Sequence, residues 1–468
     1  MLISESILER AGLELRGEWD EWLPKVVIDS RKVKKGELFW ALPGSSGHGQ
    51  DFAFKALESG ASVIAVEKEW AQKNEADLVG KTHLVMKDTL AGLQDLAREV
   101  RRSVGGYVFG LTGSNGKTTT RELLSAALST AGKTASSEGN YNNHIGLPLT
   151  ILNLEGDENF VVLEMGANHV GEIQFLCELA HPEFGLITNI GDAHVGEFGG
   201  FDKLKQAKGE LFDSLAENDG LAIVNLDDPQ VVDNAGKVKR KVGYTLSEVP
   251  DFWTSSVYQG KIVEKDAWSR ATIEVEGMRM MLQLPGTHWA QAALAAYAGA
   301  VELGAEIEEA FRALGQVKPV EGRGRIYDLG DGIQLLDDSY NANVASIKSV
   351  LSTLACRPGR RIAVLGDILE LGVFEEEEHR KVGAIESLEY IDRIYFVGHR
   401  MSRAADEAEA AGHRGVVRVA LEEVELLAKR LDEDLSRHAG IVVKGSRLTG
   451  LDRVVRDLLA MRGTERLN

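Results

Sequence analysis

A strand, a glycine-rich loop and a helix in direct succession constrain this chain more than any other sequence feature. Residues 107–112 form an apolar, β-rich run, and a helix is expected to begin near Thr119. Backbone amides of such a loop and the positive end of the helix bind phosphate groups. A Lys-Thr pair at the end of the loop is typical of triphosphate sites, where it contacts the outer phosphates and Mg2+. The predicted phosphate-binding residues are Gly113, Ser114, Asn115, Gly116, Lys117, Thr118 and Thr119.

The loop departs from the general phosphate-loop pattern G-x-x-x-x-G-K-[ST] at one position. The first glycine of that pattern would stand at residue 111, where this chain has Leu111. The segment is therefore a variant of the loop, and other segments must identify the class of protein.

The length and the alternation of elements predict the fold class. The chain has 468 residues, and at roughly 150 residues per domain this favours about three domains. Short β-rich runs alternate with helical stretches, which predicts an α/β protein with mostly parallel sheets. We expect a small N-terminal α/β domain over residues 1–102, a central nucleotide-binding domain over 103–317 and a Rossmann-like C-terminal domain over 318–468.

Charge and cysteine usage exclude several classes of function. The formal net charge is −19 and is spread along the chain, which argues against non-specific binding to nucleic acid or to anionic membranes. Cys177 and Cys356 lie far apart without partners at metal-ligand spacing, so no disulfide framework or zinc site is indicated. No apolar run approaches the length of a membrane span. We expect a cytoplasmic protein without membrane insertion.

Three more side chains stand where a nucleotide site would need them. Glu164 ends the apolar run 160–165 and His194 follows the run 184–190, and open parallel sheets bind ligands at such strand ends. Lys208 falls on the apolar stripe of a helix predicted over 201–215, where an unpaired ammonium is costly. Each has a simpler interpretation: a solvated loop carboxylate, a structural histidine, and a lysine that reaches solvent along the helix edge.

Together these segments resemble the Mur ligase family and the related folylpolyglutamate synthetases. The matching motifs run in family order from Asp29 to Arg447. Within the family, segments 336–343 and 365–372 are similar to the ligases that add D-alanyl-D-alanine, and no Asp-Asn-Pro-Arg tetrapeptide follows the strand at 393–397. The resemblance implies ATP-dependent ligation of D-alanyl-D-alanine to a UDP-linked muramoyl tripeptide through an acyl phosphate, a step of peptidoglycan synthesis.

The resemblance also implies roles for individual residues. Thr118 and Glu164 would bind one Mg2+, while His194 and a carbamylated Lys208 would bind a second. Arg325 would contact the γ-phosphate. The remaining implied contacts are His288 and Asp338 with the nucleotide, Ser30 and Arg31 with the UDP moiety, Asn142 and Asn143 with the muramoyl substrate, Asn341 with the incoming amine, and Lys444 with the dipeptide carboxylate. Asn343 is explained nearly as well by an Asx turn that closes a strand.

One segment departs from the family pattern. Where relatives have Gly-x-His-Asn-x-x-Asn, this chain has Trp289 and Ala292 in place of the asparagines. We expect Trp289 to stack on adenine and Gln291 to supply a replacement hydrogen bond.

Two alternatives remain open at this stage. Another amide ligase of the same superfamily would share the loop and the lysine, but it lacks the Asp-Ser-Arg segment at 29–31. A nucleotide-dependent switch protein would need the loop but not the carboxylate, the histidine and the buried lysine. The sequence does not identify the third residue of the precursor peptide, and a monomer is expected.

Overall fold

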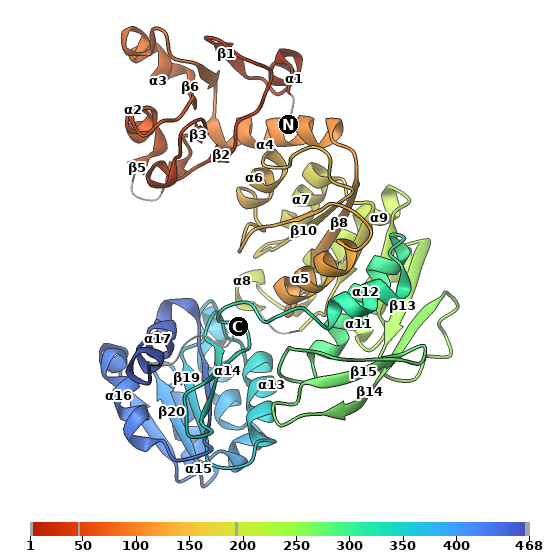
Figure 1. Cartoon of the computed structure of the whole chain (residues 1–468), viewed down its shortest axis with the longest axis vertical. Helices are drawn as coiled ribbons and strands as arrows, with labels where there is room; N and C mark the ends of the chain where they lie inside the picture. The colour runs from red at the N-terminus through yellow and green to blue at the C-terminus, as the bar shows by residue number, and fades with distance from the viewer. Residues whose placement is uncertain (1–2, 45–46, 192–194, 464–468) are drawn as a thin grey trace.

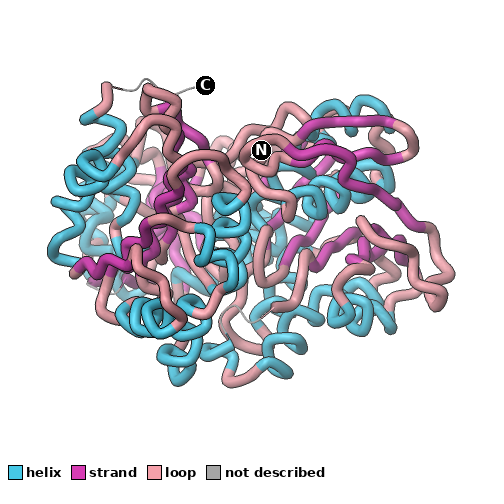
Figure 2. The backbone as a smooth tube through the Cα atoms, turned by 90° about the horizontal axis from the view of Figure 1, so that it is seen from below, coloured by secondary structure: helices cyan, strands magenta, loops and turns pink. Residues whose placement is uncertain are grey.

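The computed structural model describes residues 3–44, 47–191 and 195–463, and these form three α/β units in chain order (Figure 1). Each unit is built on one large, mostly parallel sheet with helices against it. Figure 2, turned by 90°, shows helices alongside the strands in each part of the chain. The predicted α/β class is confirmed. The division at residues 102 and 317 stays a prediction.

The first unit contains a five-stranded sheet within the described residues, in the order β1-β7-β6-β3-β2. Only β1 runs antiparallel to its neighbour, β7. The strands are β1 (Glu14–Arg16), β2 (Val26–Val27), β3 (Leu38–Trp40), β6 (Val63–Glu67) and β7 (His83–Met86). Helix α4 (Thr89–Ser103) ends the unit and packs on α6 (Gly146–Leu152) and α7 (Glu172–Ala180) of the next. This helix therefore anchors the first unit to the second.

The central unit carries a sheet of nine described strands, in the order β16-β15-β14-β13-β12-β11-β8-β10-β9. The run from β9 to β14 is parallel, and β15 and β16 extend it as antiparallel strands. Its strands are β8 (Tyr107–Thr112), β9 (Thr134–Ser136), β10 (Phe160–Glu164), β11 (Phe184–Ile187), β12 (Leu221–Asn225), β13 (Arg240–Thr245), β14 (Val257–Lys265), β15 (Ala271–Val275) and β16 (Met278–Met281). The inner parallel strands β8, β10, β11 and β12 are almost continuously apolar because both faces are buried.

Different helices cover the two faces of the central sheet. On one face α5 (Lys117–Leu128), α11 (Trp289–Glu302) and α12 (Ile307–Leu314) form a core with the side chain of Phe109. On the other, α6, α7 and α9 (Phe201–Glu217) pack around Val108 and Leu163. Helix α5 begins at Lys117, two residues before the position expected from the sequence.

Two glycines let α9 approach the sheet closely. A Cβ at Gly185 of β11 would lie 2.8 Å from Leu215 Cδ1 and 3.2 Å from Leu211 Cγ. A Cβ at Gly110 of β8 would lie 2.9 Å from Leu211 Cδ1. The leucines of α9 thus pack directly on backbone, which brings the middle of the helix to the sheet edge where the phosphate loop begins.

The third unit contains a six-stranded sheet in the described part of the chain, in the order β17-β18-β22-β19-β20-β21. The strands are β17 (Arg325–Asp328), β18 (Gln334–Asp338), β19 (Arg361–Gly366), β20 (Arg393–Val397), β21 (Val416–Val419) and β22 (Gly440–Lys444). Helices α13 (Val344–Ala355), α14 (Glu375–Gly383) and α15 (Ser402–Ala410) cover one face, and α16 (Val424–Asp434) and α17 (Leu451–Met461) the other. Across the described residues, no helix is long and apolar enough to span a membrane.

A larger side chain at Gly185 tests the close approach of α9. Gly185→Val should lower the free energy of unfolding by about 1–3 kcal/mol, because the added methyl groups must displace Leu211 or Leu215 from a filled core. Chemical denaturation followed by circular dichroism measures the change. Gly236→Val, where an added Cβ meets nothing within 4 Å, is the matched control. Equal stabilities for the two variants would contradict the packing described.

Candidate active site

A cavity of about 1100 Å3 lies where the carboxyl ends of the central strands face the third unit. The phosphate loop, the end of β10 and helix α9 line one side of this cavity. The loops after β18 and β22 line the other. In Figure 1 this is the region between the central unit and the blue C-terminal unit. Ligands of open parallel sheets bind at this edge.

The phosphate loop has the backbone geometry that anion binding requires. Gly113 and Gly116 have φ of 146° and 81°, and Gly116 caps the start of α5. A Cβ at Gly113 would lie 1.9 Å from Thr188 Oγ1, so only glycine fits there. The hydroxyl of Ser114 donates to the carbonyl of Gly191 at 3.0 Å. The loop is therefore held by the residues that follow β11, and it leads directly into the start of α5.

Lys117 is folded back onto its own loop. Its Nζ donates to the carbonyl of Gly113 at 2.7 Å. The depth of the cavity lowers the pKa of Lys117, an effect that the negative charge of Glu164 opposes and the positive charge of Arg323 reinforces. A triphosphate in the loop would supply the anionic partner that this ammonium lacks.

The carboxylate of Glu164 is almost fully buried, with 2% of the residue exposed, and is contacted by three polar side chains from two segments. The Thr118 hydroxyl donates to Oε2 at 3.0 Å and the Asn142 amide to Oε1 at 2.9 Å. The Arg121 guanidinium lies 3.5 Å from Oε2. Mg2+ is usually bound by one or two carboxylates together with phosphates and water. The adjacent oxygens of Thr118 and Glu164 fit such an ion beside a bound triphosphate.

Lys208 faces the interior from α9, as the apolar stripe predicted. The residue is 4% exposed, and its Nζ lies 5.4 Å from the centre of the Phe198 ring. Burial, reinforced by the charge of Lys117, lowers the pKa of Lys208 to about 7. No hydrogen bond or ion pair to Lys208 is found within the described ranges. His194, the expected companion of this lysine, lies outside the described residues.

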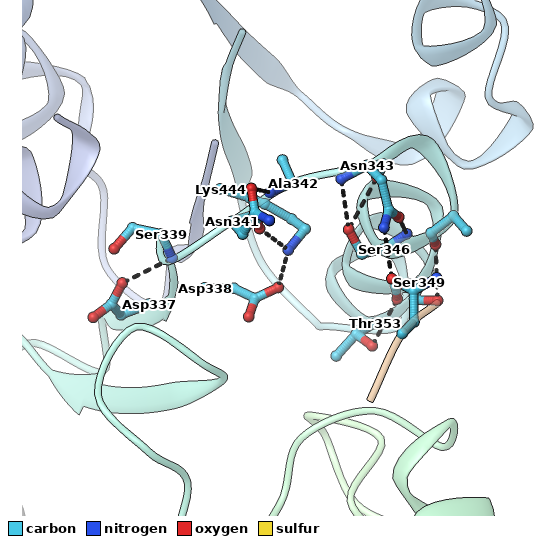
Figure 3. Close-up of polar contacts among 12 residues, drawn as sticks. Asp337, Asp338, Ser339, Asn341, Ala342, Asn343, Ser346, Ser349, Thr353 and Lys444 are labelled. Carbon is cyan, nitrogen blue, oxygen red and sulfur yellow. Dashed lines mark hydrogen bonds and ion pairs between the residues drawn. The ribbon is translucent and has the colours of Figure 1, made fainter. Parts of the chain in front are cut away.

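The third unit presents a buried ion pair to the cavity (Figure 3). Lys444 Nζ bonds Asp338 Oδ2 at 2.6 Å and the carbonyl of Asn341 at 2.9 Å. Lys444 ends β22 and is 3% exposed, whereas Asn341 is exposed. The three residues thus form one cluster, and Lys444 is not a simple strand cap.

The arginines of the segment 322–325 point in different directions. Arg325 is the first residue of β17, and its guanidinium lies 5.5 Å from the centre of the Tyr327 ring, away from the cavity lining. Arg323 lines the cavity instead, with its guanidinium 4.1 Å from the centre of the Tyr340 ring. Arg323 was not among the residues predicted from the sequence. Residues two apart share one face of a strand, so side-chain alternation would have placed both arginines on the same side, and only the turn before β17 directs Arg323 to the cavity.

The start of α11 supplies an aromatic wall. His288 and Trp289 both line the cavity, with ring centroids 4.5 Å apart. The His288 ring is exposed to the cavity, yet the cavity's depth and the charge of Lys444 lower its pKa, so the imidazole is neutral at pH 7. The Gln291 amide donates to Asn225 Oδ1 and Asp227 Oδ2, both at 2.7 Å. Both N–H groups of the Gln291 amide are therefore occupied, and they are not available for the hydrogen bond to the nucleotide that the sequence suggested.

The remaining predicted residues divide into two groups. Asn142 and Asn143 line the cavity, and Asn143 Oδ1 accepts from the backbone of Gly146 at 2.9 Å. Ser30 and Arg31 lie in the first unit and do not line it. Arg31 is exposed and pairs with Asp29 at 2.9 Å, which lowers the pKa of that carboxyl to about 2. Ser30 and Arg31 therefore belong to a surface of the first unit that is separate from the cavity.

Comparisons with known proteins agree with this architecture. Profiles of the Mur ligase family match in order: its catalytic domain over residues 25–101, its middle domain over 111–300 and the glutamate ligase domain over 322–447. The chain is 36% identical to the UDP-N-acetylmuramoyl-tripeptide--D-alanyl-D-alanine ligase of Escherichia coli, covering 95% of each chain. It is 32% identical to the Bacillus subtilis ligase of the same name, covering 93% of each.

Solved structures give the same result. A crystal structure of MurF from Acinetobacter baumannii is similar with a TM-score of 0.82 and 28% identity, covering 98% of this chain and 99% of that one. MurF from Thermotoga maritima in complex with ADP is similar with a TM-score of 0.80 and 26% identity, covering 95% and 99%. The chain therefore belongs to the Mur ligase family.

Proposed function

We propose that this chain is an ATP-dependent ligase that joins D-alanyl-D-alanine to a UDP-linked muramoyl tripeptide, forming the pentapeptide precursor of peptidoglycan. The observation that carries the proposal is one cavity that brings together the phosphate loop, the buried carboxylate of Glu164, the buried Lys208 and the cluster around Lys444. The names of the relatives support the choice of substrates.

The reaction must overcome the poor electrophilicity of a carboxylate. Transfer of the γ-phosphoryl group of ATP to the peptide carboxylate gives an acyl phosphate, and the amine of the dipeptide then attacks its carbonyl carbon with phosphate as the leaving group. Both partners of the first step are anions, so charge neutralisation and alignment supply most of the catalysis. Lys117 and Arg323 are placed to provide positive charge at the phosphates.

The residues beside the phosphate loop fit a magnesium ion. Mg2+ held by Thr118 and Glu164 would neutralise charge on the phosphates, and a second ion on the Lys208 side would do so at the acyl phosphate. Lys208 suits this purpose as a carbamate: its neutral amine attacks CO2, loses a proton and becomes an anion. A pKa near 7 supports this chemistry, since much of the amine is neutral at physiological pH. We include His194 as the companion ligand on the family resemblance.

The other substrates have separate places in this proposal. Asn142 and Asn143 are assigned to the tripeptide side, because they line the cavity next to Glu164. The cluster around Lys444 is assigned to the dipeptide, and Ser30 and Arg31 to the UDP moiety on the first unit. We keep the expectation of a monomer, and use of ATP supports a cytoplasmic location.

Phosphate release tests the proposed function directly. The purified protein with Mg2+ and bicarbonate should release phosphate from ATP only when both the UDP-linked tripeptide and D-alanyl-D-alanine are present. Mass spectrometry should then identify the UDP-linked pentapeptide. A release rate that neither acceptor changes would sink the proposal in favour of a nucleotide switch or a different ligase.

Lys208 provides a pH- and bicarbonate-dependent signature. Lys208→Ala should reduce kcat by roughly 100-fold or more, since a ligand for an ion at the acyl phosphate is lost. Wild-type activity should fall as the pH is lowered through about 7, because protonation of the amine prevents carbamate formation. Added bicarbonate should raise wild-type activity, with no effect on the variant. Lys205→Ala, one turn away and paired with Asp233, is the control. Identical pH profiles for wild type and Lys208→Ala would refute the role.

Trp289 tests how the base is held. Trp289→Ala should raise the KM for ATP by roughly tenfold, because this is the usual loss of affinity when one base loses its stacking partner. Trp289→Phe should retain most of the affinity. Steady-state kinetics at saturating acceptors measures both. Trp22→Ala, on an exposed tryptophan of the first unit, is the control. An unchanged KM in Trp289→Ala would mean that the indole does not contact adenine.

A further inference from the structure

The oxygen and the nitrogen of the Asn343 side-chain amide make hydrogen bonds to different parts of the structure. It is the N-cap of α13, and its Oδ1 accepts from the backbone amide of Ser346 at 2.8 Å. The Ser346 hydroxyl in turn accepts from the backbone amide of Asn343 at 3.0 Å, which completes a capping box (Figure 3). Because the cap uses the oxygen, the orientation of the amide is fixed and its Nδ2 faces away from the helix.

That nitrogen reaches the phosphate loop of the central unit. Asn343 Nδ2 donates to Asn115 Oδ1 at 2.6 Å, across 228 positions of sequence. The backbone of Asn115 is held separately: its amide donates to Asn189 Oδ1 at 3.0 Å, and its carbonyl accepts from Thr188 Oγ1 at 2.7 Å. The end of β11 thus fixes the loop itself, and the side chain of Asn115 is left to meet the third unit.

The segment that carries Asn343 also carries the acceptor side of the cavity. Asp338 and Asn341 hold Lys444 and lie five and two residues before Asn343: Asp338 ends β18, and Asn341 is in the loop between β18 and α13. A hydrogen bond at Asn343 therefore connects the phosphate loop, where the carboxylate is activated, with the residues assigned to the incoming dipeptide.

We propose that Asn343 is a positioning residue that sets the third unit in register with the phosphate loop through Asn115. This inference rests on the proposed ligase function and adds to it. The bond fixes how far the dipeptide amine stands from the acyl phosphate. Reactions between two bound partners depend steeply on this distance, and a misplacement of about 1 Å costs on the order of 100-fold in rate.

A substitution that keeps the helix cap separates this role from a structural one. Serine is as good an N-cap as asparagine, but its hydroxyl is too short to cap α13 and reach Asn115 together. Asn343→Ser should therefore leave Tm and the affinity for ADP unchanged, while kcat falls roughly tenfold or more. Tm is measured by calorimetry, ADP binding by titration, and kcat by acceptor-dependent phosphate release.

A double-mutant cycle with Asn115→Ala identifies the partner. If the two side chains act as one unit, Asn343→Ser should cause no further loss of kcat when Asn115 is already alanine. Multiplicative losses in the double variant, or an unchanged kcat in Asn343→Ser, would overturn the inference while the ligase assignment stands. A wild-type protein that releases no phosphate in response to both acceptors would overturn the assignment and this inference with it.

Discussion

The burial of one carboxylate, Glu164, is the constraint on which the rest of the site depends. A buried charge is unstable without partners, so the end of β10 must be surrounded by groups that donate to it. Those donors come from the first two turns of α5, through Thr118 and Arg121, and from the loop that carries Asn142. The phosphate loop, the central sheet and the tripeptide-side loop are therefore held in one geometry by a single anion.

The same wall of the cavity also carries two buried lysines. Lys117 and Lys208 both lie deep in the cavity, where burial lowers the pKa of each, and the charge of Lys117 lowers that of Lys208 further. Lys117, together with the protonated fraction of Lys208, adds positive charge beside one buried carboxylate, which favours entry of an anionic triphosphate. Conversion of Lys208 to a carbamate would reverse the sign of one of these groups. The charge balance of the site is thus set by a chemical state of Lys208 as much as by its position.

Apolar runs and helical periodicity predict the features that depend on residues close together in the sequence. These patterns predicted the strand at 107–112, the loop of Gly113 and Gly116, and a buried side chain at Lys208. The structure has all three. The antiparallel extension by β15 and β16 was not expected, because alternation alone does not reveal which sheet a strand joins. The bond between Asn343 and Asn115 joins two units, and no spacing rule in one sequence anticipates it. Arg325 was predicted to face the cavity and Arg323 was not, because the turn before β17, which sets the direction of these side chains, leaves no periodic pattern in the sequence.

The third unit also contacts the central unit around Trp268, and this contact differs in kind from the one at Asn115. Trp268, in the turn between β14 and β15, is buried against the third unit, donates to Gln334 Oε1 at 2.7 Å and packs under the Arg357 guanidinium at 4.3 Å. Arg357 also bonds Gln334 Oε1, at 2.8 Å, so this contact is a network of apolar, aromatic and polar groups. The contact at Asn115 is one hydrogen bond between neutral amides, which contributes little free energy. A small displacement of the third unit would therefore break the bond at Asn115 more readily than the network at Trp268, which makes that weak contact the one that reports whether the acceptor side is in place.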